Sequence, residues 1–160
     1  MLLKDEKRDI LQIIDTYSDT IYKICFVYLK NKFDAEDALQ ELFIKIYEKA
    51  PIFLNEEHEK AWIIRVTINH CKNILRYNYI RKCLAIDENI VAIDNPTNET
   101  LQHILKLSLH YRNVLYLYYY EGYSTKEIAS ILRKKEATIR TWLKRARENL
   151  KQIMGDDYEK

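Results

Sequence analysis

Four basic side chains recur at helical spacing near the C-terminus of this 160-residue chain. Arg140, Lys144, Arg147 and Lys151 follow one another at steps of four, three and four, so one face of an α-helix would carry them all. Residues 126–151 hold nine basic and three acidic residues, a local excess of six against a net charge of +2 for the whole chain. Such a face can bind phosphates or the acceptor groups on base edges. A solvated basic face is the alternative, since a run of charge alone usually means no more than that.

The elements around this basic stripe have the layout of a helix-turn-helix. Ser124 and Glu127 stand at capping-box spacing and predict the start of a short helix. A polar break at residues 133–136 precedes a longer helix expected from about residue 137 to 154, and Ala129 is small enough to let the two helices cross closely. The capped helix, the turn and the stripe together favour DNA binding in the major groove over an ordinary solvated surface.

A second helix face carries side chains suited to unpaired bases. On a helix expected from about residue 59 to 82, an aromatic, an amide and three cations lie opposite the apolar stripe of Ile64, Ile68, Cys71 and Leu75. Stacking on aromatics, hydrogen bonds to base edges and cations along the backbone are what bind single strands. The alternative is that the aromatic packs on a neighbouring helix and the rest is ordinary surface, and both readings stay open. The residues are Trp62, Arg65, Asn69, Lys72 and Arg76.

An acidic face is expected on the preceding helix, which we predict to begin at Asp34 as N-cap and to stop at Pro51. Its apolar face carries Ala38, Leu39, Leu42, Phe43, Ile46 and Tyr47. The opposite face carries Asp34, Asp37, Glu41 and Glu48, opposed nearby only by Lys45. DNA would be repelled from it and a basic protein partner attracted, although a solvated acidic face is the commoner explanation.

Composition and periodicity predict the fold class. Two Gly and two Pro in the whole chain leave few turn formers, which favours long helices joined by few loops. A first helix is expected from residue 10 to about residue 32, and with the two helices above it makes one small bundle. A polar, acidic stretch at residues 84–100 predicts a linker, after which residues 101–109 and 111–121 form two helices and Gly122 breaks the period. Within them, residues 114–120 are apolar and aromatic enough to be buried on most sides.

The sequence therefore predicts an all-α protein of two small helical domains, residues 1–83 and 101–160, joined by a linker at residues 84–100. No Ser/His/Asp, metal-ligand or Gly-rich phosphate signature is present, so we expect no enzyme, metal or cofactor. Three cysteines without CxxC spacing fit buried thiols in a reducing compartment. With a charged N-terminus and no stretch long enough to span a bilayer, we expect a cytoplasmic protein without membrane insertion.

Two ordered motifs carry a family resemblance over nearly the whole chain. DAEDALQELFIKIYEKA (34–50) with AWIIRVTINHCKNILR (61–76) resembles region 2 of extracytoplasmic-function (ECF) RNA polymerase sigma factors, and YYYEGYSTKEIASILRKKEATIRTWLKRARENL (118–150) resembles their region 4. The resemblance implies a factor that binds core RNA polymerase and directs promoter-specific initiation, without catalysis of its own. It also implies an anti-sigma factor as a partner. A stand-alone helix-turn-helix regulator of duplex DNA is the alternative.

The resemblance also implies roles for particular residues. The acidic helix would dock on the clamp helices of the polymerase β′ subunit, and the region 4 domain would bind the β flap and the -35 element. The face on residues 62–76 would melt and read the -10 element, with Asn69 nearest the flipped-out base and Trp62 as a wedge, while Arg65, Lys72 and Arg76 hold phosphates. The docking residues would be Asp34, Asp37, Gln40 and Glu41. The recognition-helix residues would be Thr138, Arg140, Thr141, Lys144, Arg145 and Arg147.

The sequence departs from the family pattern at three places. Lys135, Glu136 and Ala137 stand where Gly and a Pro are common, Trp142 where a basic residue is frequent, and His110 where a Pro is common. These departures leave the fold prediction intact and put the -35 sequence preference in doubt.

Overall fold

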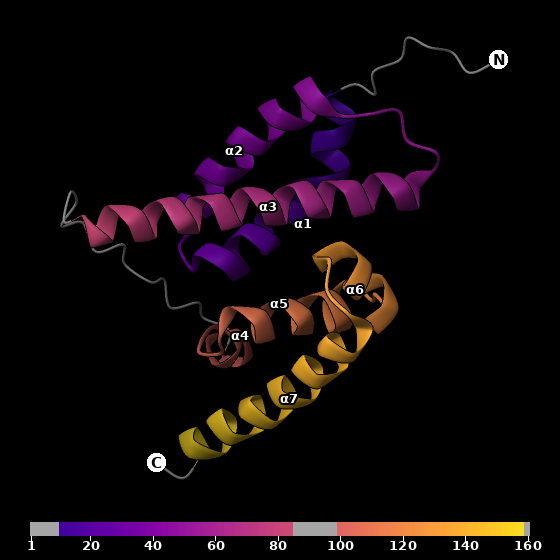
Figure 1. Ribbon diagram of the computed structural model, residues 1–160. Helices are drawn as coiled ribbons and strands as arrows, with labels where there is room; N and C mark the ends of the chain where they lie inside the picture. Colours follow the sequence, from indigo (N-terminus) through magenta and orange to yellow (C-terminus); the bar gives the residue numbers. More distant parts are fainter. Residues whose placement is uncertain (1–9, 85–98, 159–160) are drawn as a thin grey trace. The chain divides into compact units, whose positions relative to one another are not determined.

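The computed structural model describes residues 10–84 and 99–158. Every regular element within these residues is a helix, and the chain divides into two compact units, Met1–Ala92 and Ile93–Lys160, which confirms the all-α class with two small helical domains. The expected linker, residues 84–100, falls almost wholly outside the described residues, so the domain bounds stay predictions. The helices, labelled in Figure 1, are α1 (Ile10–Leu29), α2 (Lys32–Lys49), α3 (Glu56–Cys83), α4 (Glu99–Leu105), α5 (Leu109–Leu115), the π-helical η1 (Tyr116–Tyr120), α6 (Thr125–Leu132) and α7 (Glu136–Tyr158).

The first unit is a bundle in which α1 packs on both α2 and α3. Its core is formed by one apolar face of each helix, with Ile21, Leu42 and Ile64 fully buried. Each such side chain contributes about 1.5–3 kcal/mol of burial free energy. The C-terminal part of α3 runs on beyond α2 in Figure 1, and Leu75, expected in the core stripe, is only half-buried.

The junction between α1 and α2 differs from the expectation. α1 ends at Leu29 rather than near Lys32, because Lys30 turns into the left-handed region at φ 57°. The N-cap of α2 is Asn31, not Asp34: the Asn31 side chain accepts a hydrogen bond from the Asp34 backbone amide at 2.9 Å. Asp34 therefore lies inside the first turn, where a carboxylate favours the helix N-terminus. The predicted stop at Pro51 is confirmed, since α2 ends at Lys49.

The start of α3 is fixed by a cap and by a buried hydrogen bond to α1. Asn55 caps the helix by accepting from the His58 amide at 2.8 Å, so α3 begins three residues before the expected Glu59. Glu59 is buried, and the Tyr17 hydroxyl of α1 donates to its carboxylate at 2.6 Å. This hydrogen bond holds the first turns of α3, which lead to Trp62, against α1.

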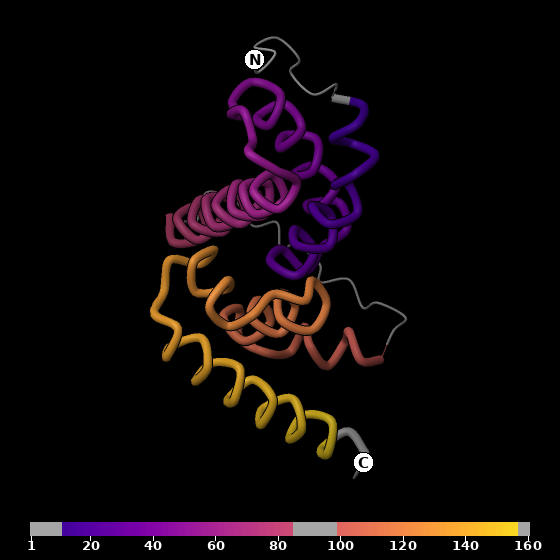
Figure 2. The backbone as a smooth tube through the Cα atoms, turned by 90° about the vertical axis from the view of Figure 1, so that its right-hand side faces the viewer, coloured from indigo at the N-terminus to yellow at the C-terminus, as the bar shows by residue number. Residues whose placement is uncertain are grey.

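The second unit contains the predicted helix-turn-helix. The capping box at Ser124 and Glu127 is present in both directions, with hydrogen bonds of 3.2 and 2.8 Å. Arg133 ends α6 in the left-handed conformation at φ 54°. Helix α7 packs on α6, and Ile139 and Leu143 of α7 are buried. In Figure 2 α7 continues as one long helix, coloured yellow, to the end of the described chain.

The tyrosine-rich segment before α6 is less buried than expected. Residues 116–120 form a π-helical turn, in which Leu117 is fully buried while Tyr119 and Tyr120 are 61% and 62% exposed. The expectation of burial on most sides for residues 114–120 is therefore wrong at its C-terminal end. The wider π-helical turn directs one apolar residue inward and leaves the last two tyrosines at the surface.

Candidate nucleic-acid and partner interfaces

The basic face of α7 is exposed along its length. Of the six residues expected in the recognition helix, five are exposed and Thr138 is half-buried. The Thr141 hydroxyl donates to the Ala137 carbonyl at 3.0 Å, which restrains the rotamer of this exposed side chain. The exposed members are Arg140, Thr141, Lys144, Arg145 and Arg147.

Glu136 ties together the first turns of α6 and α7. One of its carboxylate oxygens accepts from the Thr125 hydroxyl at 3.0 Å and from the Arg140 guanidinium at 2.8 Å. These two hydrogen bonds, that from Thr125 foremost, lower the pKa of Glu136. The turn thus lacks the Gly and Pro common in the family and is held instead by a left-handed Arg133 and this bridging carboxylate.

Arg147 is oriented by two tyrosines, which the sequence did not predict to contact the basic face. Its Nε donates to the Tyr119 hydroxyl at 2.5 Å, and its guanidinium carbon lies 5.5 Å from the ring centre of Tyr118 and 5.4 Å from that of Tyr119. Because only Nε is used in the bond to Tyr119, the guanidinium can still offer its terminal nitrogens to a phosphate.

The other two departures from the family pattern contact each other. The His110 imidazole of α5 stacks on the Trp142 indole of α7, with ring centres 4.6 Å apart and planes inclined by 21°. Trp142 is half-buried, so this indole supports the packing of α7 on α5. A basic residue at that position would instead have added a cation to the helix.

The expected single-strand face of α3 is divided by burial. Asn69, Lys72 and Arg76 are exposed, whereas Trp62 and Arg65 are half-buried. The Arg65 Nε is buried and has no hydrogen-bond partner within the described residues. The amide and two of the cations are therefore presented to a partner directly, and Arg65 contributes from a recessed position.

Trp62 packs on the segment that precedes its own helix. Its ring centre lies 5.5 Å from that of Phe53, which in turn meets the His58 ring edge-on at 5.5 Å. The alternative reading, in which Trp62 is a packing residue, is thus right in part, but the neighbour is a loop rather than a helix. The sequence does not single out Phe53, because Ile52 and Leu54 on either side of it are equally apolar.

The acidic face of α2 mixes carboxylates with exposed apolar groups. Asp37, Gln40 and Glu41 are exposed and Asp34 is half-buried. Burial, and then the neighbouring charge of Asp37, raise the pKa of Asp34. The exposed apolar side chains on α2 are Phe33, Ile44 and Tyr47, 72%, 61% and 55% exposed. The exposure of Tyr47 corrects its expected place in the core stripe.

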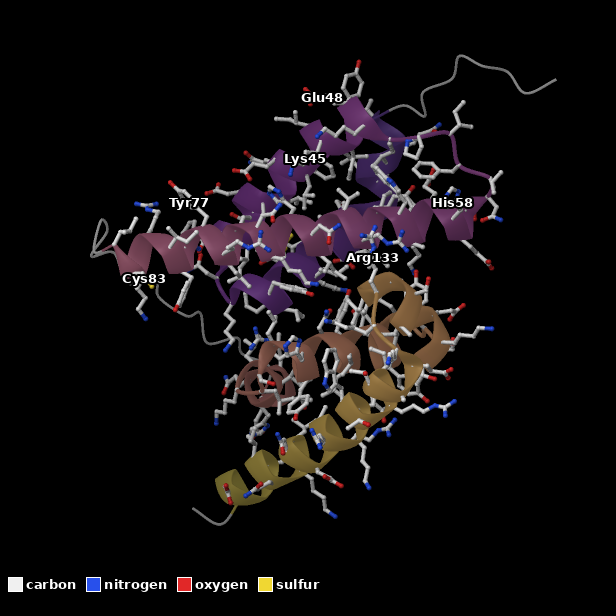
Figure 3. All side chains as sticks on the ribbon, in the orientation of Figure 1. Lys45, Glu48, His58, Tyr77, Cys83 and Arg133 are labelled. Carbon is white, nitrogen blue, oxygen red and sulfur yellow. The ribbon has the colours of Figure 1, made fainter. Side chains whose placement is uncertain are left out.

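His70 of α3 is hydrogen-bonded to two charged side chains of α2. Its Nε2 lies 2.8 Å from Glu41 Oε2 and its Nδ1 lies 3.1 Å from Lys45 Nζ. Lys45 is labelled in Figure 3 on α2. The adjacent Cys71 is buried with its sulfur 3.6 Å from that of Cys25. No cluster of three or more potential metal ligands occurs in the described parts of the chain.

Comparison with known protein families identifies the family of the chain that carries these faces. Residues 13–79 match the model of sigma-70 region 2, and residues 98–150 match that of sigma-70 region 4. The chain belongs to the sigma-70 family. It is an ECF RNA polymerase sigma factor: it binds RNA polymerase and directs promoter-specific transcription initiation, and like other sigma factors it is not an enzyme.

SigW and SigM of Bacillus subtilis are similar to this sigma factor over nearly their whole length. It is 29% identical to the ECF RNA polymerase sigma factor SigW of Bacillus subtilis (strain 168), over 96% of this chain and 92% of SigW. It is 27% identical to SigM of the same organism, over 89% of this chain and 93% of SigM. The presence of both regions in order argues against the stand-alone regulator, which would need only the second.

Two solved structures share the fold. The sigma factor RpoE from Bartonella quintana, in complex with the anti-sigma factor NepR, has a TM-score of 0.75 at 20% identity, covering 92% of this chain and 98% of RpoE. CnrH, in complex with the cytosolic domain of CnrY, has a TM-score of 0.68 at 21% identity, covering 95% of this chain and 91% of CnrH. Within the described residues of this sigma factor, no helix has the length and apolar character needed to cross a lipid bilayer.

Proposed function

We propose that this sigma factor binds its partners through three helix faces. α2 docks on the β′ clamp helices of core polymerase, α3 melts and reads the -10 element, and α7 reads the -35 element. The observation that carries the proposal is the separation of charge in the first unit. Asn69, Lys72 and Arg76 form an exposed amide and cation face on α3, while Asp37 and Glu41 are exposed on α2. DNA and a basic protein surface are thus attracted to different helices.

Docking through α2 is supported by the electrostatics of Asp34. The raised pKa of Asp34 means that its charged form is disfavoured in the free protein, by burial and by Asp37. A cationic partner surface would offset the repulsion between Asp34 and Asp37 and favour the charged form of both carboxylates. The exposed Ile44 and Tyr47 add apolar area to the same helix, and clamp docking would cover it.

Reading of the -10 element is assigned to Asn69, with phosphates held by Lys72 and Arg76 and, from its recessed position, by Arg65. An exposed amide can pair with the edge of a base that has left the stack. Trp62, braced by Phe53, is the wedge at the edge of the melted duplex. A half-buried indole in contact with a second aromatic ring is restrained, which suits a residue that must hold an unstacked base pair apart.

Reading of the -35 element is assigned to α7. The N-terminal residues of a recognition helix lie closest to base edges, so Thr138, Arg140 and Thr141 are placed for base contact. Lys144, Arg145 and Arg147 lie farther along the helix and bind phosphates. The second unit would also bind the β flap.

An anti-sigma factor is the proposed regulator. The similar RpoE structure is a complex with the anti-sigma factor NepR, and the similar CnrH structure is a complex with the cytosolic domain of CnrY. An inhibitor of this chain would be expected to cover the exposed faces of α2 and α7. Since RNA polymerase is the partner, we place the protein in the cytoplasm.

The test is transcription by core polymerase with the purified factor on genomic DNA from the source organism. Glu41→Lys should weaken core binding more than tenfold, while Asp15→Lys, an exposed charge reversal on α1, should not. Asn69→Ala should keep core binding and lose promoter opening, while Asn78→Ala, on the opposite side of α3, should keep both. Tight binding of duplex DNA by the factor alone, with no binding to core, would overturn the proposal.

A further inference from the structure

The His70 imidazole connects α3 to two charged residues on the docking helix. It is only 8% exposed and lies within hydrogen-bond distance of both Glu41 and Lys45, which are four residues apart on α2. A Glu and a Lys at this spacing commonly pair directly along a helix. Here each is hydrogen-bonded to the same imidazole instead.

The chemistry of the two partners fixes the state of the imidazole. An ammonium group can only donate, so Nδ1 must accept from Lys45. A carboxylate can only accept, so Nε2 must carry the proton and donate to Glu41. The imidazole is therefore neutral and in a single tautomer. Burial, and next the charge of Lys45, lower the pKa of His70, which favours this neutral state.

The arrangement has opposite effects on the two α2 side chains. Lys45 is half-buried, its ammonium drawn toward α3. The Glu41 side chain is 60% exposed, and one carboxylate oxygen is held by His70 while the other makes no hydrogen bond within the described residues. The acidic face thus presents a carboxylate held by one oxygen, and the ammonium of Lys45 bonds the imidazole rather than this carboxylate.

We propose that His70 is a positioning residue for polymerase docking: it holds the Glu41 carboxylate toward the partner and keeps Lys45 from neutralising it. The proposal rests on the docking role of α2. His70 directly follows Asn69, so a single turn of α3 presents the base-reading amide and orients the docking carboxylate.

Two substitutions of His70 separate positioning from packing. His70→Leu keeps apolar bulk but lets Lys45 pair with Glu41, and should lower the affinity for core polymerase about five- to tenfold. His70→Gln can accept from Lys45 through its oxygen and donate to Glu41 through its nitrogen, and should stay within about twofold of wild type. A role in packing alone predicts the reverse order, because Leu suits a buried site better than Gln.

A double-mutant cycle tests whether His70 acts through Glu41. In a Glu41→Ala background, His70→Leu should have no further effect on core affinity. Equal losses in both backgrounds would overturn the proposal. Asp37→Lys reports on docking independently: if it weakens core binding while His70→Leu does not, the positioning role alone is wrong. If neither variant has an effect, the docking role itself fails.

The tautomer can be observed in the intact wild-type protein, whatever the variants do to folding. Nitrogen-15 NMR of the imidazole should show an unprotonated Nδ1 and a protonated Nε2 at neutral pH. A proton on Nδ1, or on both nitrogens, would refute the proposed pair of hydrogen bonds, from Lys45 to Nδ1 and from Nε2 to Glu41. Circular dichroism of each variant confirms that affinities are compared between folded proteins.

Discussion

Replacing Tyr17 by Phe tests how α1 holds the start of α3. The change removes one hydroxyl and keeps the ring, which is 5% exposed in the core of the first unit. The lost contact is the 2.6 Å hydrogen bond from the hydroxyl to the buried Glu59 carboxylate. Trp62 follows one turn later on α3, so the bond also steadies the proposed wedge.

The expected cost follows from the character of this bond. A hydrogen bond to a charged group contributes about 1.5–3 kcal/mol, roughly twice a neutral one. Burial of both groups excludes the water that could replace the hydroxyl, so we expect a loss of about 2 kcal/mol in the free energy of unfolding. In a domain of under 100 residues this corresponds to a fall of roughly 8–16 °C in melting temperature.

Urea unfolding followed by tryptophan fluorescence measures this loss in one unit at a time. The chain has two tryptophans, Trp62 and Trp142, one in each unit, so a Trp142→Phe background restricts the signal to the first unit. Tyr77→Phe, which removes the hydroxyl of a tyrosine that is 61% exposed, is the matched control and should change stability by less than about 0.5 kcal/mol. Equal stabilities for the two variants would refute the reasoning.

Three further predictions concern the cap, the buried imidazole and the basic face. Ser124→Ala should cost the second unit about 1 kcal/mol, measured by Trp142 fluorescence in a Trp62→Phe background. The pKa of His70 is lower in the folded protein than its ordinary value of about 6.5, so the folded state favours the neutral imidazole. This contribution to stability is complete above about pH 6.5 and is lost as the pH falls through the pKa of the folded state. Urea unfolding between about pH 7 and pH 5 should show the loss in wild type but not in His70→Gln. Arg147→Gln should reduce the slope of log affinity for -35 duplex against log salt by about 0.9, whereas Tyr119→Phe should lower affinity and leave the slope unchanged.

The helices and their order could be predicted because hydrophobic periodicity and the positions of the few turn-forming residues are local features of the sequence. The capping box at Ser124 is an example, since both of its hydrogen bonds join residues three apart. The α1–α2 junction was mispredicted for a physical reason. Asn31 and Asp34 are both residue types that favour the N-cap position. The choice between them depends on Lys30 adopting a left-handed conformation, which the sequence does not predict for a lysine.

The exposed faces of the candidate sites were also within reach of the sequence. A helical stripe places Asn69, Lys72 and Arg76 on one side whatever the rest of the fold does. The intramolecular contacts of these side chains could not be predicted, because they join elements that are distant in sequence. Tyr119 lies 28 residues from Arg147, and Glu41 lies 29 residues from His70. Such contacts depend on how helices pack, which periodicity does not specify.

Both units use a polar side chain that bridges two helices to hold a functional face in place. His70 joins α3 to α2, and Glu136 joins α7 to α6. In each case the bridging residue also contacts a residue proposed to bind a partner, Glu41 in the first unit and Arg140 in the second. A charged side chain that is already oriented loses less conformational freedom on binding, and we expect this to favour docking through Glu41. Glu136 orients Arg140 as well, but its negative charge also offsets part of the attraction of Arg140 to DNA.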